Sequence, residues 1–123
     1  DGQSITIRGI TIEGCGKEHA VMHSSLPLAE NVGYLVAGRF FYPGDALAIP
    51  KKPVDILALP VAGPWLTIGQ AIDYAIAVKP KVCIPVHDAM LKNVELTRRI
   101  PAPILAKLGI DLKDIDEEVN FSY

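Results

Sequence analysis

Hydrophobic and polar side chains alternate along the first part of the chain. Residues 4–13 (SITIRGITIE) alternate with a period of two, and Gly9 interrupts the run. This pattern is typical of a bent strand, or of a pair of strands, with one solvated face. The apolar segments 32–36 and 39–42 flank Ala37-Gly38, a two-residue connection typical of a β-hairpin. The pattern therefore predicts antiparallel strands over the first third of the chain.

A near-continuous apolar run, 54–61, and a second apolar run, 82–86, follow this region. Each has the length and composition of a strand that is buried on both faces. Between them, Thr67 and Gln70 have the spacing of a capping box, and apolar residues then recur at helical spacing as far as Pro80. Strand, helix and strand in this order predict a βαβ unit with parallel strands and a right-handed crossover. The predicted fold class is α/β with a mixed sheet.

The pattern is weaker beyond residue 87. Residues 91–99 are predicted to be helical, Pro101 and Pro103 to break the helical pattern, and residues 104–108 to add a short turn. Residues 119–123 alternate like a final edge strand. At 123 residues, the chain has the length of one domain, 1–123, with a substantial core.

Composition and charge narrow the class of protein. The net charge is −2 and the 12 Lys and Arg residues are scattered, so no nucleic-acid partner is predicted. The chain has no apolar run of about 18 residues, which argues against a membrane span. Two cysteines make no disulfide framework, and the chain has no basic-then-apolar leader, so we expect a cytoplasmic protein. Because half of the residues are apolar, we expect many buried strands or a surface that another chain covers.

Four polar side chains lie at strand ends or in loops that follow strands: His19, His23, Asp45 and His87. Ligands of open α/β sheets bind at such ends, and imidazole and carboxylate groups are ligands that suit zinc, iron or manganese. A histidine at a strand end is also commonly a hydrogen-bonded structural residue, so the residues alone leave both interpretations open. Trp65, on the loop after the first buried run, either lines a substrate pocket or caps the core.

Several segments, in this order, resemble the C-terminal half of metallo-β-lactamase-fold hydrolases. They are the segment EHAVMH at 18–23, NVGY at 31–34, the turn PGD at 43–45 after a Phe/Tyr-rich strand, the strand PVDILALPV at 53–61, and KPKVCIPVH at 79–87. The resemblance covers residues from about 5 to 90. It implies half of an αββα sandwich, a mixed sheet with a βαβ unit in which helices cover one side.

The resemblance also implies a metal site and a reaction. Asp45 would bridge two metal ions, and His19 and His87 would each bind one of them, with His23 as the alternate to His19. The metal would be zinc, or iron or manganese, and Trp65 would line the substrate pocket. The implied function is a metal-dependent hydrolase in which an activated water attacks an ester, amide, lactone or phosphodiester.

One part of the family pattern is missing. The motif HxHxDH, which supplies most of the metal ligands, lies in an N-terminal half, and no His-x-His occurs in this sequence. Hydrolysis would therefore need a separate N-terminal half. The alternative is a non-catalytic half-domain that lacks a complete metal site and forms a homo-oligomer. In either case we expect a homodimer or a complex with the N-terminal half, which would bury the apolar sheet face carrying Ile5, Ile7, Ile10, Ile12 and residues 40–42.

Overall fold

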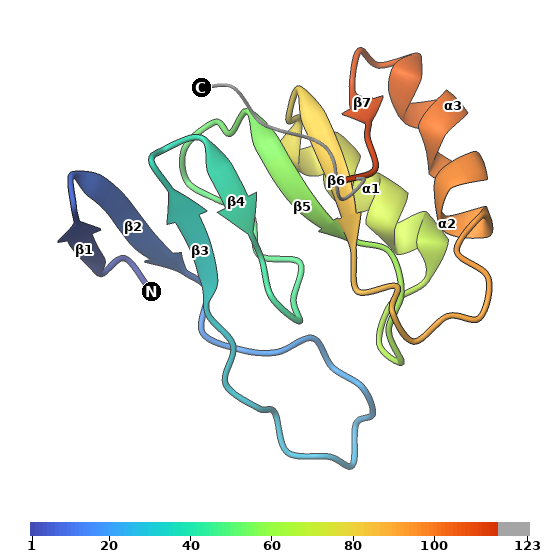
Figure 1. The fold of residues 1–123 in the computed structure, drawn as a ribbon. Helices are drawn as coiled ribbons and strands as arrows, with labels where there is room; N and C mark the ends of the chain where they lie inside the picture. The colour runs from blue at the N-terminus through green and yellow to red at the C-terminus, as the bar shows by residue number, and fades with distance from the viewer. Residues whose placement is uncertain (116–123) are drawn as a thin grey trace.

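A computed structural model describes residues 1–115, which form one seven-stranded mixed sheet with helices on one side (Figure 1). The strands lie side by side in sequence order, from β1 at one edge to β7 at the other. Their bounds are β1 Ser4–Ile7, β2 Ile10–Cys15, β3 Gly33–Val36, β4 Phe40–Tyr42, β5 Ile56–Pro60, β6 Val82–Val86 and β7 Asp111–Leu112. The helices are α1 Ile68–Val78, α2 Leu96–Arg99 and α3 Pro101–Ala106.

Two tight hairpins build the N-terminal half of the sheet. β1 pairs with β2 and β3 pairs with β4, both antiparallel. The connecting residues Arg8-Gly9 and Ala37-Gly38 all have positive φ, as two-residue hairpin turns require. The strand pair predicted over residues 4–13 and the hairpin predicted around Ala37-Gly38 are both confirmed.

The predicted βαβ unit is also confirmed. β5 and β6 are adjacent and parallel, with Leu57 opposite Cys83, and α1 connects them. The capping box forms as its spacing predicts, because the Thr67 side chain accepts from the backbone of Gln70 while the Gln70 side chain reaches back to the backbone of Thr67. The helix ends at Lys79, whose backbone is left-handed.

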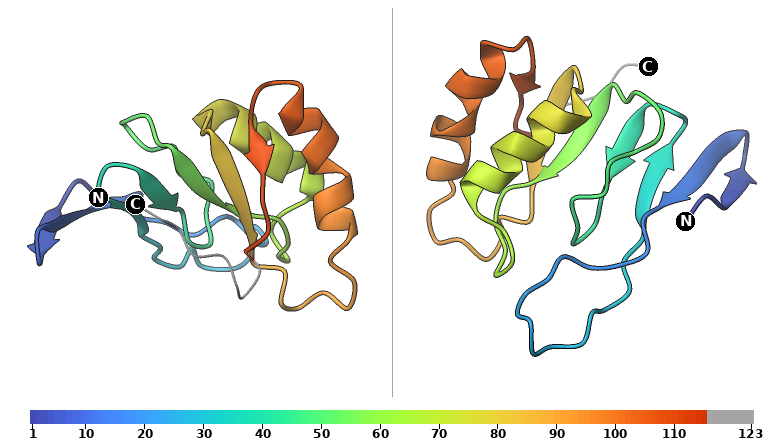
Figure 2. Two further views of the ribbon diagram at one scale, coloured as in Figure 1. Left: turned by 45° about the horizontal axis from the view of Figure 1, so that its top comes forward. Right: turned by 180° about the vertical axis from the view of Figure 1, so that it is seen from behind.

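The core lies between the sheet and the helices. Its sheet side consists of alternate residues of the central strands, namely Leu35, Phe41, Leu57, Leu59 and Cys83, and its helix side includes Ala71, Ile72, Tyr74, Ala75 and Leu105. Figure 2 shows the helices together on this face of the sheet. Burial raises the pKa of the Cys83 thiol to about 12, so this cysteine is an inert apolar part of the core.

The opposite face carries no helix within residues 1–115, and near β1 and β2 it is open to solvent. Residues directly opposite each other in paired strands point to the same face. Ile5 pairs with Ile12 and Ile7 pairs with Ile10, so these four side chains share this face. Ile5, Ile7 and Ile10 are 59%, 53% and 49% exposed. One sheet with helices on a single face is the arrangement expected for half of an αββα sandwich.

The C-terminal segment differs from its prediction. The helix expected over 91–99 is only α2, and the prolines expected to break the pattern instead begin α3. Proline is tolerated in the first turn of a helix because those N–H groups have no partner within the helix. The short strand β7 was not predicted, and the strand predicted for 119–123 lies outside the described residues. No helix of residues 1–115 has the length and apolar character to cross a membrane.

Candidate metal centre

Strand direction brings the predicted site residues to one edge of the sheet. β4, β5 and β6 are parallel, and β2 points the same way because two antiparallel pairings separate it from β4. The C-terminal ends of these four strands therefore meet at one rim. His19, Asp45, Trp65 and His87 follow those ends in turn, one residue from each connection.

The side chains of His19, Asp45 and His87 converge at this rim. The Nε2 atom of His87 lies 3.2 Å from Oδ1 of Asp45, and Nε2 of His19 lies 3.9 Å from Oδ2 of the same carboxylate. Each carboxylate oxygen therefore faces one imidazole. The imidazoles are mostly covered, whereas the Asp45 side chain is 43% exposed and so remains accessible from solvent.

The backbone fixes the orientation of the His19 ring. Its Nδ1 lies 2.6 Å from the carbonyl oxygen of Ala20. Because a carbonyl can only accept, Nδ1 carries the proton and Nε2 keeps its lone pair when the ring is neutral. That lone pair is on the side of Asp45. Metal-binding histidines commonly have this arrangement, in which the far nitrogen donates to a carbonyl.

His87 reaches the rim through an unusual backbone conformation. Its φ is +70°, a region that non-glycine residues seldom adopt and that clusters at functional sites. The next residue, Asp88, is held by an ion pair with Arg98 of α2, which also donates from Nε to Asp114 at 2.8 Å. This ion pair therefore anchors the residue that follows His87 in the turn after β6.

Trp65 lies beside both histidines. Its ring centroid is 5.9 Å from that of His19 and 6.3 Å from that of His87, and both contacts are edge-to-face. The tryptophan therefore forms an apolar wall beside the two imidazoles. Its role in a substrate pocket stays a prediction.

Of the two histidines on the loop between β2 and β3, it is His19 that faces Asp45. His23 is hydrogen-bonded within its own loop, where its Nδ1 accepts from the backbone N–H of Ser25 at 3.2 Å and lies 2.7 Å from the Ser25 hydroxyl. Both histidines lie on the loop that follows β2, so the sequence alone allows either of them to reach the rim. The path of the loop decides which one does.

Two other residues support the rim: Asn31, whose side chain is hydrogen-bonded to Pro43 and Asp45, and Arg98, which pairs with Asp88. Neither of them was predicted from the sequence to have a role at the site, although Asn31 belongs to the segment 31–34 that carries the resemblance.

The donor set fits part of a metal site. Imidazole nitrogens and a carboxylate are zinc ligands, and ligand atoms of a tetrahedral zinc at about 2.0–2.2 Å lie roughly 3.3–3.6 Å from one another. The two nitrogen–oxygen distances, 3.2 and 3.9 Å, are close to that spacing. Within residues 1–115, however, no group of three or more His, Cys, Asp or Glu side chains is placed so that it could hold a metal ion. The three residues therefore fit as ligands, but not as a complete ligand set.

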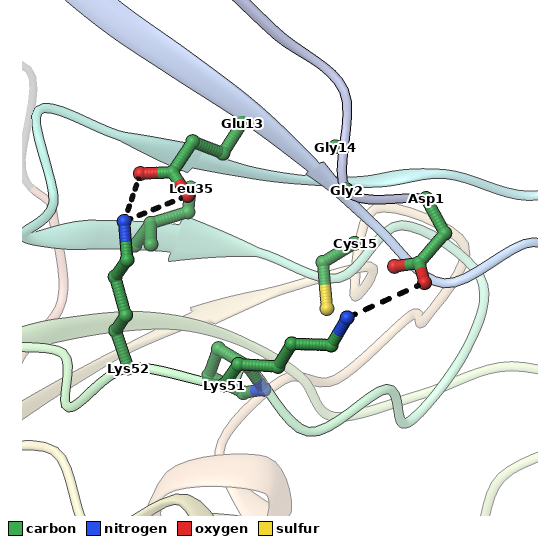
Figure 3. Close-up of a pocket in the computed structure, with 9 residues that line it drawn as sticks. Asp1, Gly2, Glu13, Gly14, Cys15, Leu35, Lys51 and Lys52 are labelled. Atoms are coloured by element: carbon green, nitrogen blue, oxygen red, sulfur yellow. Dashed lines mark hydrogen bonds and ion pairs between the residues drawn. The ribbon is translucent and has the colours of Figure 1, made fainter.

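A cavity of about 220 Å³ lies elsewhere, against β2 and the segment before β5 (Figure 3). The ion pair of Lys52 with Glu13 lies on its wall, as does the half-buried Cys15. Burial raises the pKa of the Cys15 thiol, which keeps it protonated and unreactive. The imidazole–carboxylate cluster at the rim is the better candidate site, because two imidazoles and a carboxylate, groups of the kind that bind metals, converge there.

Comparison with known proteins places the chain in a family. Residues 1–87 match the family model described as the Beta-lactamase superfamily domain. The chain is 40% identical over 95 residues to protein Rv0786c of Mycobacterium tuberculosis, a match that covers 73% of this chain and 45% of that protein.

Solved structures show the same fold at low sequence identity. A candidate Zn-dependent hydrolase of the metallo-β-lactamase superfamily from Thermotoga maritima matches with a TM-score of 0.57 and 20% identity, covering 81% of this chain and 56% of that one. Igni18, a metallo hydrolase from Ignicoccus hospitalis, matches with a TM-score of 0.61 and 13% identity, covering 99% and 59%. A variant of the CmlA β-hydroxylase matches with a TM-score of 0.61 and 10% identity, covering 94% and 31%. The chain thus spans about half the length of the curated relative, and of two of these structures.

Proposed function

The chain belongs to the metallo-β-lactamase superfamily, and from this premise we propose that it is the C-terminal half of a metal-dependent hydrolase domain. Asp45, His19 and His87 are its contribution to the metal site. The observation that carries the proposal is that the two imidazole Nε2 atoms face the two oxygens of one carboxylate. A carboxylate with one histidine at each oxygen has the arrangement needed to bridge two metal ions.

The roles of the residues follow from their contacts. His19 offers Nε2 because its Nδ1–H is committed to the Ala20 carbonyl. His87 is presented by a left-handed turn whose next residue is held by Arg98. Trp65 packs edge-to-face against both imidazoles and would shield one side of the cluster from water. A bound metal ion would supply Lewis acidity and lower the pKa of a water molecule. The substrate is an ester, amide, lactone or phosphodiester.

A second half is part of the proposal. Two metal ions need more ligands than three side chains supply, since a catalytic zinc normally has three protein ligands and a water. An N-terminal half, in the same or a separate chain, would supply these ligands and cover the open apolar face of β1 and β2. In the isolated chain, a second copy would take its place on that face, because an apolar surface of this kind is normally an interface.

Zinc titration of the metal-free chain by isothermal calorimetry tests the ligand assignment. The variants His19→Ala, Asp45→Ala and His87→Ala are each expected to weaken zinc binding by more than about tenfold, the loss typical of disturbing a metal site. His23→Ala is the matched control, because it removes a histidine from the same loop without touching the cluster. Equal losses in His19→Ala and His23→Ala would contradict the assignment.

The incomplete ligand set also supports a second candidate, a non-catalytic half-domain that forms a homo-oligomer. The same titration separates the two. A wild-type chain that binds zinc, iron and manganese no better than His19→Ala supports the non-catalytic half-domain.

A further inference from the structure

The side chain of Asn31 links the loop that carries His19 to the turn that carries Asp45. Its Oδ1 accepts a hydrogen bond from the backbone N–H of Asp45 at 2.9 Å, and its Nδ2 donates to the carbonyl oxygen of Pro43 at 2.9 Å. One amide group therefore holds the turn on both sides of Gly44. The amide suits both contacts because it has a donor and an acceptor on separate atoms, whereas a carboxylate has no donor and an alkyl side chain has neither group.

Gly44 is matched to this contact. Its φ is +69°, and a Cβ added there would lie 2.3 Å from Oδ1 of Asn31, closer than a carbon and an oxygen that are not bonded can approach. Glycine is thus required twice, for the left-handed backbone and for the space that the amide occupies. The turn could not change its residue 44 without displacing Asn31.

Backbone hydrogen bonds join the two ends of the same loop. Asn31 N–H donates to the carbonyl of Lys17 at 3.0 Å, and His19 N–H donates to the carbonyl of Ala29 at 2.9 Å. The N–H of Ala20 then donates to the carbonyl of Asp45 at 2.8 Å. Ala20, which follows the candidate ligand His19, is therefore hydrogen-bonded to the backbone of the candidate ligand Asp45.

We propose that Asn31 is a positioning residue that sets the separation of His19 and Asp45 for metal binding, an inference that rests on the proposed function. Asn31 lies near the C-terminal end of the loop between β2 and β3, and its amide holds the backbone N–H of Asp45. Ala20 lies near the start of that loop, and its N–H holds the carbonyl of Asp45. Without the amide, the turn would be held to the loop on one side only, and the carboxylate would lose its fixed place opposite Nε2 of His19. Asn31 itself does not bind the metal.

The test compares Asn31→Ala with Asn93→Ala. Asn93 is a matched control because its Oδ1 also accepts from a backbone N–H, that of Glu95 at 2.8 Å, in a different part of the molecule. Zinc affinity and the melting temperature are measured for each. Asn31→Ala is expected to lower the affinity about 10- to 100-fold, as loss of a supporting contact around a metal site does, whereas Asn93→Ala leaves the affinity unchanged.

The visible absorption spectrum of bound cobalt(II) provides a signature that a loss of stability alone would not move. We expect Asn31→Ala to change the band positions, and Asn31→Asp to fail to restore them, because it retains the acceptor but not the donor. If Asn31→Ala keeps wild-type affinity and spectrum while Asp45→Ala loses binding, the positioning role is wrong and the proposed function stands. If Asp45→Ala binds as well as wild type, the proposed function is wrong and this inference falls with it.

A measurement without metal tests the contact itself. Gly44→Ala is expected to lower the melting temperature, and part of that loss should disappear when Asn31→Gly is added, because the added Cβ then meets no amide. Strictly additive shifts in the double variant would show that the amide does not hold the turn, and would overturn the proposal.

Discussion

Tyr74 connects the core to the segment that bears Asp45, and removing its hydroxyl tests how that segment is held. The side chain is 4% exposed, and its hydroxyl donates to the carbonyl oxygen of Ala48 at 2.6 Å. Burial raises the pKa of the phenol above its usual value, so it remains a donor throughout the physiological range. Tyr74→Phe deletes the donor and leaves the ring in place.

The magnitude follows from the partner that is left behind. A typical hydrogen bond contributes about 0.5–1.5 kcal/mol net, and an acceptor left buried without a partner costs about 1–3 kcal/mol. Ala48 is only half-buried, so water can reach its carbonyl and the lower values apply. We expect Tyr74→Phe to lower the free energy of unfolding by about 1 kcal/mol, or the melting temperature by roughly 4 °C.

Urea denaturation followed by the fluorescence of Trp65 measures this change. Tyr34→Phe is the matched control, because that side chain is 48% exposed on β3, and its loss should stay within about 0.5 kcal/mol. Equal effects of the two substitutions would refute the argument that the Tyr74 hydroxyl holds residues 43–55, which connect β4 to β5, against α1.

Three further outcomes are expected. Thr67→Ala removes the N-cap of α1 and should cost about 1 kcal/mol in the same urea assay; no change would mean that the cap is dispensable. Lys81 and Arg39 hold the pKa of Asp55 below its ordinary 3.8, so this carboxylate contributes stability above that pH and loses it as the pH falls through the lower folded value. Asp55→Asn should therefore flatten the acid limb of the stability curve below about pH 4, and an unaltered limb would show that these ion pairs do not contribute. Light scattering should report a dimer of the isolated chain that Ile5→Lys dissociates and Ser4→Lys, on the other face of β1, does not; a wild-type monomer at micromolar concentration would contradict association through this face.

The elements that the sequence predicts best are those with a strong local signal. Alternation over 4–13, the Ala37-Gly38 turn and the Thr67 capping box each depend on neighbouring residues, and each forms as predicted. The prolines of α3 were misjudged because the same residue either breaks a helix or begins one, and its position relative to the first turn decides which. β7 is only two residues long, too short to leave a pattern.

The sequence indicates which residues could form the candidate site, but not which contacts support them. Parallel strands that end at one rim are enough to bring His19, Asp45 and His87 together, and these follow from the order of elements. The choice between His19 and His23 depends on the path of the 17-residue loop between β2 and β3, which contains no helix and no regular strand. The contacts of Asn31 could not be predicted either, because an amide that bonds to backbone atoms of another segment leaves no mark in the local sequence.

Anomalous diffraction at the zinc absorption edge, from crystals of the chain grown with zinc, tests the central claim most directly. The account predicts zinc at the Asp45 carboxylate, beside Nε2 of His19, beside Nε2 of His87 or at both places, at about 2.0–2.2 Å from the nitrogen and the carboxylate oxygen that bind it. Zinc bound only at His23 or Cys15, or no anomalous peak at the rim in crystals where these three side chains are ordered, would contradict it.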